Sequence, residues 1–348
     1  MSTTPDGAPA VTGRRGGGAL LSLLLGLGVS LALLWWAVRG LRPEDVIQHV
    51  RNARPLPLAL SVLFATAVFP IRALRWRLLL READDAPLRL PAAWHGVAIG
   101  FMANNLLPFR AGEVLRAYAA SRLAPVRMSS AFASVAVERV FDGLTVVATL
   151  GIALLTAGLP DGVRVAGLPV PELAQRVGLI AGAAFLVAAI LVARPLATAR
   201  LIERLVPFRG LSRRLVGLFE GVRLGLVALR SPRRLFAVIV WSLVLWGVNA
   251  MSFAALFPAF DLKVDFAGAL LVQSAIVFGV AVPSSPGYVG VLEAAAIVAL
   301  TLYGVPHDRA FAYAITYHAA TFLPITLLGL YSLVRMPAGW RTMGNTQA

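Results

Sequence analysis

Four short clusters of polar and charged residues interrupt otherwise apolar stretches of this chain. In the first cluster, Arg72-Ala-Leu-Arg75-Trp76, the two arginines are three residues apart and share one face of a helix. Paired guanidinium groups can bind phosphate oxygens through parallel hydrogen bonds. Arginines followed by a tryptophan also anchor the cytoplasmic end of a membrane span, so this cluster alone fits both interpretations.

The second cluster, residues 104–116, combines helix-breaking proline and glycine with amides and charges. Such breaks leave backbone groups available to a ligand. Glu113 and Arg116 could pair at one-turn spacing, which would leave Arg110 to meet an anion. Two amide side chains complete the predicted headgroup site: Asn104 and Asn105.

The third cluster places Glu138, Arg139 and Asp142 inside an apolar segment. Glu138 and Asp142 are four residues apart, so they share a helix face. Charged groups at membrane depth cost about 2.5–3.5 kcal/mol on insertion scales, so they require partners. Arg110 and Arg116 are the candidate partners. A buried ion-pair network and a direct ligand contact are both compatible with this pattern.

The fourth cluster lies in residues 283–293, a stretch rich in proline, serine and glycine. Ser284 and Ser285 offer hydroxyl groups, and a helix beginning near Gly290 would direct its positive end towards an anion. Gly287 likewise permits unwound backbone and close approach. Glu293 follows among alanine and valine, where an unpartnered carboxyl would be protonated or functional, so it is a candidate proton-coupling residue.

Other chemistries receive no support from the sequence. With no cysteine, thiolate catalysis and cysteine-bound metals are excluded. We find no phosphate-binding loop, no nucleophile elbow and no zinc-protease motif. His95 and His318 lie in apolar segments and are interpreted as packing residues. We therefore predict no catalytic residue, no metal and no cofactor.

The composition excludes a soluble domain. The 348 residues are 58% hydrophobic and 14% charged, with a formal net charge of +15. Soluble domains average about 25% charged residues. The basic residues occur mainly beside apolar runs, which indicates contact with the bilayer and with anionic lipid rather than with nucleic acid. Nothing in the sequence supports a homo-oligomer.

We predict an all-α polytopic membrane protein with about six full spans and two re-entrant or broken helical hairpins. The hairpin segments are residues 92–108 and 267–304. The predicted spans are 19–38, 56–71, 131–158, 178–193, 235–257 and 311–334.

Arginine counts favour the hairpins over the alternative of eight or nine plain spans. With both hairpins, 23 basic residues lie in cytoplasmic segments and eight lie outside, with both termini cytoplasmic. The two halves then have opposite orientation, as in transporters built from inverted repeats. The expected parts are a cytoplasmic N-terminus (1–18), one transmembrane domain (19–334) with an amphipathic cytoplasmic connector (194–234), and a cytoplasmic tail (335–348).

The four clusters, in this order, resemble the transmembrane region of lysylphosphatidylglycerol synthases. The matching patterns are R-x-x-R-W from Arg72, N-x-x-x-P-x-R-x-G-E-x-x-R from Asn104, E-R-x-x-D from Glu138 and P-G-x-x-G-x-x-E from Pro286. The resemblance implies a lipid-translocating domain without an aminoacyl-transferase domain, in a cell membrane.

The expected function is therefore flipping of a phospholipid or other anionic lipid, whose headgroup the arginines hold in a mid-membrane cavity. Two alternatives remain: a lipid-modifying enzyme with Glu113 or Glu138 as general base, and a scaffold for lipid or polysaccharide assembly.

Overall fold

The computed structural model describes residues 16–82, 86–108, 110–159, 231–282 and 284–336, and only scattered positions between 160 and 230. The predicted span 178–193, nearly all of the connector 194–234 and nearly all of both terminal segments lie outside the described residues. Within the described part, one pair of two-residue strands is antiparallel: β1 (Arg164–Val165) and β2 (Leu168–Pro169). All other regular structure there is helical.

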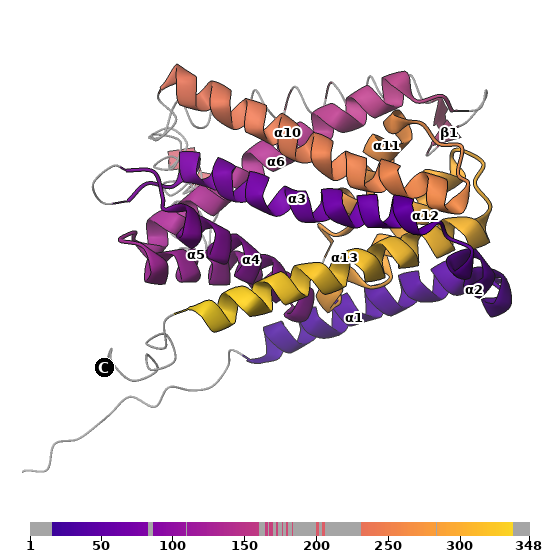
Figure 1. Cartoon of the computed structure of the whole chain (residues 1–348), viewed down its shortest axis with the longest axis horizontal. Helices are drawn as coiled ribbons and strands as arrows, with labels where there is room; N and C mark the ends of the chain where they lie inside the picture. The colour runs from indigo at the N-terminus through magenta and orange to yellow at the C-terminus, as the bar shows by residue number, and fades with distance from the viewer. Residues whose placement is uncertain are drawn as a thin grey trace, which may run out of the picture.

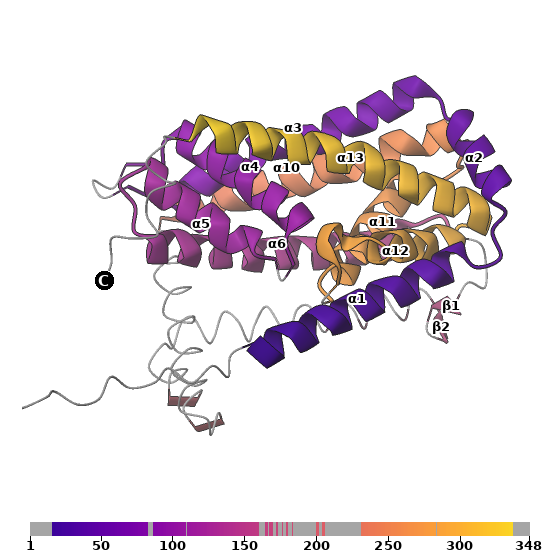
Figure 2. The same ribbon diagram turned by 90° about the horizontal axis from the view of Figure 1, so that it is seen from below.

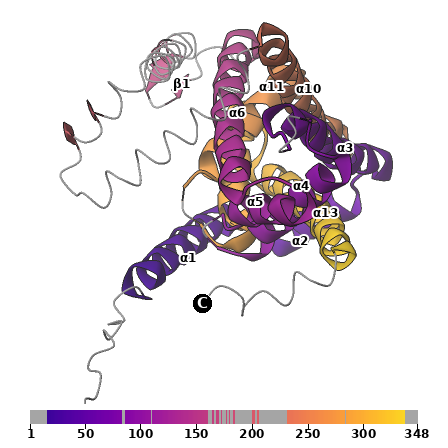
Figure 3. The ribbon, with the colours of Figure 1, turned by 90° about the vertical axis from the view of Figure 1, so that its left-hand side faces the viewer.

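Long apolar helices run roughly parallel to the longest axis of the molecule (Figure 1). They are α1 (Gly16–Val38), α3 (Pro55–Leu79), α6 (Met128–Thr156), α10 (Pro232–Leu256) and α13 (His307–Arg335). Helices α3, α6, α10 and α13 are each long and apolar enough to cross a bilayer. The last part of α1 and the short α2 (Pro43–Arg51) form a bent pair at 84°, which would make a fifth span. Figure 3 shows α1 at the edge of the bundle.

The first polar segment forms one arm of a helical hairpin. Helix α4 (Leu90–Leu106) enters the bundle, and α5 (Gly112–Leu123) returns beside it to the end where α6 begins (Figure 2). The arms have 17 and 12 residues, or about 26 and 18 Å, which is less than the roughly 30 Å of a bilayer core. The prediction that residues 92–108 form the whole hairpin was wrong, because α4 alone occupies nearly all of this range and the returning arm, α5, lies beyond it.

The second broken segment forms a matching hairpin from the opposite end. Helix α11 (Phe266–Gly279) follows a short 3-10 helix, η1 (Phe257–Phe260), and runs inward. A second 3-10 turn, η2 (Pro286–Tyr288), precedes the returning helix α12 (Val291–Thr301). The predicted break and the helix start near Gly290 are confirmed.

The order of span, hairpin and span therefore occurs twice. In the first unit α3 and α6 flank the hairpin α4–α5; in the second α10 and α13 flank α11–α12. The two hairpins enter from opposite ends (Figures 1 and 2). The all-α membrane fold with two hairpins is confirmed, and the arrangement does not support the alternative of plain spans at these segments.

Each hairpin has its own apolar surroundings. One buried cluster joins the first hairpin to α3 and α6 and includes Phe69, Trp76 and Val97. A larger cluster joins the second hairpin to α10 and α13 and includes Phe253 and Tyr313. Packing of small and apolar side chains, rather than solvent exclusion alone, holds helices together in lipid.

Helix α3 is longer than predicted, and this changes the position of its arginines. The apolar run suggests an end at residue 71, but the helix continues to Leu79. Arg72 and Arg75 therefore lie within α3 rather than at its end, and both side chains are buried in the bundle. A membrane helix can continue through charged residues when other helices supply counter-charges, which are described next.

Candidate functional site

Glu138 of α6 is the centre of a buried ion network. Its Oε1 accepts from Arg116 Nη1 of α5 at 2.8 Å and from Arg72 Nη1 of α3 at 2.7 Å. Arg116 Nη2 also donates to Oε2 at 2.8 Å, so this pair is bidentate. The Glu138 side chain is fully buried. The predicted partnership of Arg116 with the Glu138 cluster is thus confirmed, and the alternative pairing of Arg116 with Glu113 was wrong.

Asp142, one helical turn beyond Glu138, binds a second set of donors. Arg75 Nη2 lies 2.8 Å from Asp142 Oδ1, and Arg72 Nη1 lies 3.0 Å from Oδ2. Trp246 Nε1 of α10 donates to Oδ1 at 3.0 Å. Arg75 Nη1 donates to the Ser242 hydroxyl of α10 at 2.9 Å. The network therefore connects α3, α5, α6 and α10.

Two aromatic rings complete the shell of the buried arginines. The Arg116 guanidinium lies 3.9 Å from the centre of the Trp76 ring, and the Arg72 guanidinium lies 5.1 Å from the Phe101 ring. These distances are in the range of cation–π attraction. Trp76 was predicted at headgroup level, but it is fully buried and its Nε1 donates to Ser134 at 2.8 Å.

Arg139 lies at the accessible edge of the network. Its Nη2 is 2.9 Å from Glu138 and 3.0 Å from Asp142, and its Nε is 3.8 Å from Glu113. The Arg139 side chain is 37% exposed, whereas that of Arg75 is fully buried.

The network carries an excess of positive charge. Four arginines face three carboxylates, of which only Glu138 and Asp142 are buried. The Nε atoms of all four arginines are buried without a hydrogen-bond partner in the described part of the chain. A buried cluster with surplus donors and positive charge attracts an anion.

Arg110 connects the tips of the two hairpins. It has φ of 51°, in the left-handed region, and its Nη2 donates to the Val280 carbonyl after α11 at 2.7 Å. The Tyr288 side chain of η2 lies close to Arg110 and in electrostatic range of Glu113 and Arg139. Arg110 thus faces the second hairpin, not Glu138 as one of the predicted pairings required.

The two predicted amides hold the first hairpin in place. Asn104 Oδ1 accepts from the Gly112 backbone N–H at 2.9 Å and closes the turn between α4 and α5. Asn105 Nδ2 donates to Thr326 of α13 at 3.1 Å. Both residues lie near the hairpin tip, and the contacts that the structure gives them are with the protein itself.

The second hairpin tip packs against α1. The Ser285 backbone N–H donates to the Ser30 hydroxyl at 2.8 Å. Gly290 has φ of 85°, and a Cβ there would overlap the Ser30 carbonyl oxygen. Gly287, with φ of 71°, lies against Phe322 and the Asn105 carbonyl. Ser284 is half-buried beside Gly26. These glycines are required for close backbone approach, as predicted.

Glu293 has partners that the sequence did not reveal. Its Oε1 lies 2.6 Å from His318 Nδ1 of α13, and its Oε2 accepts from the Gly290 N–H at 2.7 Å. The second contact is half of a capping box at the start of α12. Glu293 is therefore not a lone carboxyl, and His318 is its partner rather than a simple packing residue.

The structure thus divides the predicted site residues into two groups. Arg72, Arg75 and Arg116 are buried and bound by carboxylates, whereas Arg110 and Arg139 are partly accessible near the hairpin tips. Sequence reasoning missed Tyr288, Ser30 and Trp246 because an isolated hydroxyl or indole in an apolar run gives no signal. No group of three metal-binding side chains occurs in the described residues.

These features define a class: a multi-pass, all-α membrane protein with two opposed hairpins that meet beside a buried arginine–carboxylate network. Residues 23–329 match the family described as the lysylphosphatidylglycerol synthase TM region, and the chain belongs to that family. The resemblance seen in the four clusters is therefore confirmed.

Several relatives span most of the chain. A UPF0104 membrane protein of Methanothermobacter thermautotrophicus is 25% identical over 89% of this chain and 90% of its own length. Another from Pyrococcus horikoshii is 24% identical over 89% and 94%. Glycosyltransferase AglD of Haloferax volcanii is 31% identical over 147 residues, which are 40% of this chain but only 23% of AglD.

Proposed function

We propose that this protein moves a phospholipid or other anionic lipid between the two leaflets of a cell membrane. The anionic headgroup contacts Arg110 and Arg139 where the hairpins meet, while the acyl tails stay in the surrounding lipid. The observation that carries this proposal is the contact of the two hairpin tips inside the bundle beside partly accessible arginines.

The position of the contact supports transport rather than surface anchoring. Arg110 is bound to the opposite hairpin through Val280, so movement of either hairpin changes the surroundings of its guanidinium. Broken helices that meet at mid-membrane form substrate sites in many transporters. An arginine can exchange a neutral carbonyl for a phosphate oxygen, which is the stronger acceptor.

The buried arginines act in this proposal as positioning residues. Arg72, Arg75 and Arg116 hold α3 and α5 against α6, and their charge makes the neighbouring hairpin tips attractive to anions. Neither the amides nor the serines need contact the headgroup for this role. The proposed contact therefore narrows to Arg110 and Arg139, with Tyr288 beside them.

Reconstituted liposomes provide the test. We would incorporate the purified protein into vesicles of phosphatidylcholine with a trace of fluorescent phosphatidylglycerol, and measure the fraction that dithionite can reduce. Wild type should expose the inner-leaflet probe, and Arg110→Ala should slow this at least about tenfold, the equivalent of 1.4 kcal/mol. Arg309→Ala, at the start of α13, is the matched control because it is a half-buried arginine far from the hairpin tips.

Each outcome has a defined meaning. If the wild-type protein exposes no inner-leaflet probe to dithionite, the proposal that it translocates this lipid is wrong. If the Arg110→Ala and Arg309→Ala variants transport lipid equally well, the proposed contact between Arg110 and the headgroup is wrong, although the proposed transport is still supported. Mass spectrometry of the recovered lipids checks the alternative of lipid modification, which predicts a covalently altered product.

The proposed orientation places both termini in the cytoplasm, which the arginine counts favour. Because the chain has no native cysteine, a single cysteine near residue 85 reports the side of the loop between α3 and α4. We expect no labelling by a membrane-impermeant maleimide in intact cells. Labelling from outside would show that the whole bundle has the opposite orientation to the one proposed.

A further inference from the structure

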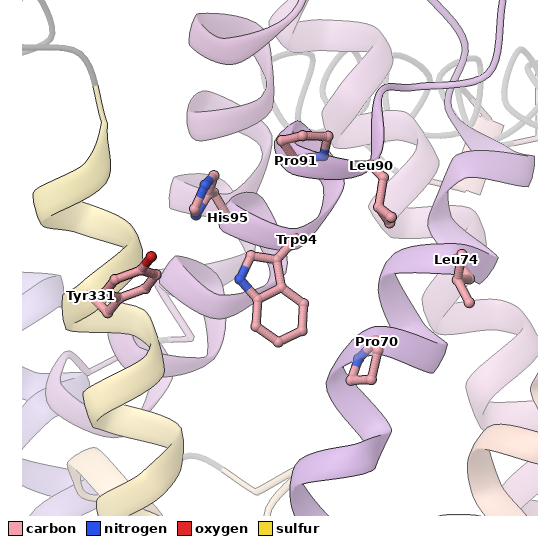
Figure 4. Close-up of a pocket in the computed structure, with 7 residues that line it drawn as sticks. All are labelled: Pro70, Leu74, Leu90, Pro91, Trp94, His95 and Tyr331. Carbon is pink, nitrogen blue, oxygen red and sulfur yellow. The ribbon is translucent and has the colours of Figure 1, made fainter.

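A pocket separate from the arginine network lies between α3, the beginning of α4 and the end of α13 (Figure 4). Its volume is about 420 Å³. Pro70 and Leu74 line the side formed by α3, Trp94 the side formed by α4, and Tyr331 the side formed by α13. Its surface is mainly hydrocarbon, so it would hold an apolar group.

The pocket opens to the outside of the bundle. Pro70, Leu90 and Tyr331 on its rim are exposed, which in a multi-pass membrane protein places the opening towards lipid. Pro70 lies nine residues before the end of α3, or about 14 Å along the helix. The pocket thus extends inward from one end of the bundle, in the direction that an acyl chain takes from its headgroup.

Positive charge lies at the rim of this pocket. Arg335, in the last turn of α13, has its guanidinium 5.3 Å from the centre of the Tyr331 ring. It also lies in electrostatic range of His95, whose buried Nδ1 has no hydrogen-bond partner among the described residues. No carboxylate pairs with Arg335 in the part of the chain that the structure describes.

We propose that this pocket binds one hydrocarbon chain of an anionic phospholipid, and that Arg335 contacts its phosphate. An apolar cavity beside an arginine that has no carboxylate partner among the described residues matches the two parts of such a lipid. The site is distinct from the contact at Arg110, and its occupancy does not rest on the proposed translocation. A lipid bound here would persist in a variant that transports nothing.

Photolabelling in nanodiscs tests the pocket directly. The probe is phosphatidylglycerol with a diazirine in one acyl chain, diluted in phosphatidylcholine, and labelled peptides are identified by mass spectrometry. Wild type should label peptides that contain Leu74, Trp94 or Tyr331. Leu74→Trp, which fills the pocket, should reduce that labelling, whereas Leu63→Trp, on the exposed face of α3 and outside the pocket lining, should leave it at the wild-type level.

A second variant, at the pocket opening, tests the proposal independently in case Leu74→Trp does not fold. Leu90 is 44% exposed, so Leu90→Trp blocks the opening without entering the packed interior. Labelling that persists in both tryptophan variants would overturn the proposal. Because neither variant touches Arg110, their dithionite rates separate failure of this site from failure of transport.

The phosphate contact has its own control. Arg335→Gln should lower labelling by phosphatidylglycerol about tenfold, the value that 1.4 kcal/mol of lost affinity gives, and leave labelling by a neutral diacylglycerol probe unchanged. Arg39→Gln is the matched variant, because Arg39 likewise lies over an aromatic ring, 5.0 Å from the centre of Trp35, and neither residue lines this pocket. Equal labelling by the two probes in wild type would overturn the role of Arg335.

Discussion

The two hairpins have the same shape but are stabilised by different interactions. The first hairpin, α4–α5, is bound by Arg116 to the carboxylate of Glu138. The second, α11–α12, has one buried carboxylate, Glu293, and packs within the larger apolar cluster, with a close backbone contact to α1 at Gly290. A repeated arrangement of helices therefore does not imply repeated chemistry.

This difference suggests a division of roles. The first hairpin carries the charge that would attract an anion, and the second supplies a backbone surface that closes against it through Val280. If the two are moving parts, the first is fixed by ion pairs that are costly to break, whereas the second depends on packing that can slide. The following predictions test that contrast.

The largest effect is expected from Glu138→Gln. The change leaves the arginines that share Glu138 with one fewer buried counter-charge, and loss of one partner of a buried pair typically costs about 3–5 kcal/mol. We expect a sharply lower yield of folded protein and a lower melting temperature by tryptophan fluorescence in detergent. Glu44→Gln, on the exposed surface of α2, is the control. A melting temperature equal to that control would show that the network contributes little to stability.

Glycine substitutions compare the packing of the two hairpins. A Cβ at Gly112 would overlap the Gly100 carbonyl between the arms of the first hairpin, and one at Gly290 would overlap the Ser30 carbonyl of α1. Overpacking typically costs about 1–3 kcal/mol, so both alanine variants should melt earlier than Gly28→Ala, where the Cβ meets nothing within 4 Å.

The second comparison concerns movement. We expect Gly290→Ala to reduce lipid translocation more than Gly112→Ala at equal folded yield, because it acts between the second hairpin and α1. Equal transport rates in the two variants would contradict the assignment of the second hairpin as the sliding part.

A smaller effect is expected from Glu293→Gln. The amide still accepts from the Gly290 N–H, so only the contact with His318 changes, and a single hydrogen bond contributes about 1 kcal/mol. Thermal melts of Glu293→Gln, His318→Ala and the double variant measure the coupling of this pair. The same variant tests the proton-coupling hypothesis: a translocation rate that follows wild type from acid to alkaline pH would exclude Glu293 as the coupling residue.

The smallest effect is expected from Asn105→Ala. It removes the hydrogen bond to Thr326, which ties the first hairpin tip to α13, and should cost about 1 kcal/mol or less. Thr326→Val removes the same bond from the other side, so the double variant should melt at nearly the temperature of either single variant. Additive losses would show that the two residues act separately.

Much of the fold could be predicted from the sequence because apolar length and arginine placement follow directly from residue types. The spans around α1, α3, α6, α10 and α13 and both breaks were identified in this way. Prediction failed at the return arm α5 and at the end of α3, since both continue as helix through charged residues. Their counter-charge Glu138 lies on α6, 22 residues from Arg116 and 66 residues from Arg72, which is beyond the reach of spacing within one helix.

A polytopic membrane protein with two broken segments could be predicted from residue types alone, since the bilayer sets the length of a span and proline and glycine interrupt helices. Which arginines are paired with a carboxylate depends instead on how the helices pack. Arg72 and Arg110 look equivalent in the sequence, yet one is buried against Glu138 and the other reaches Val280 of the opposite hairpin. The physical reason is that a guanidinium is neutralised by whichever carboxylate the fold brings within about 3 Å, and spacing along the chain does not specify that partner.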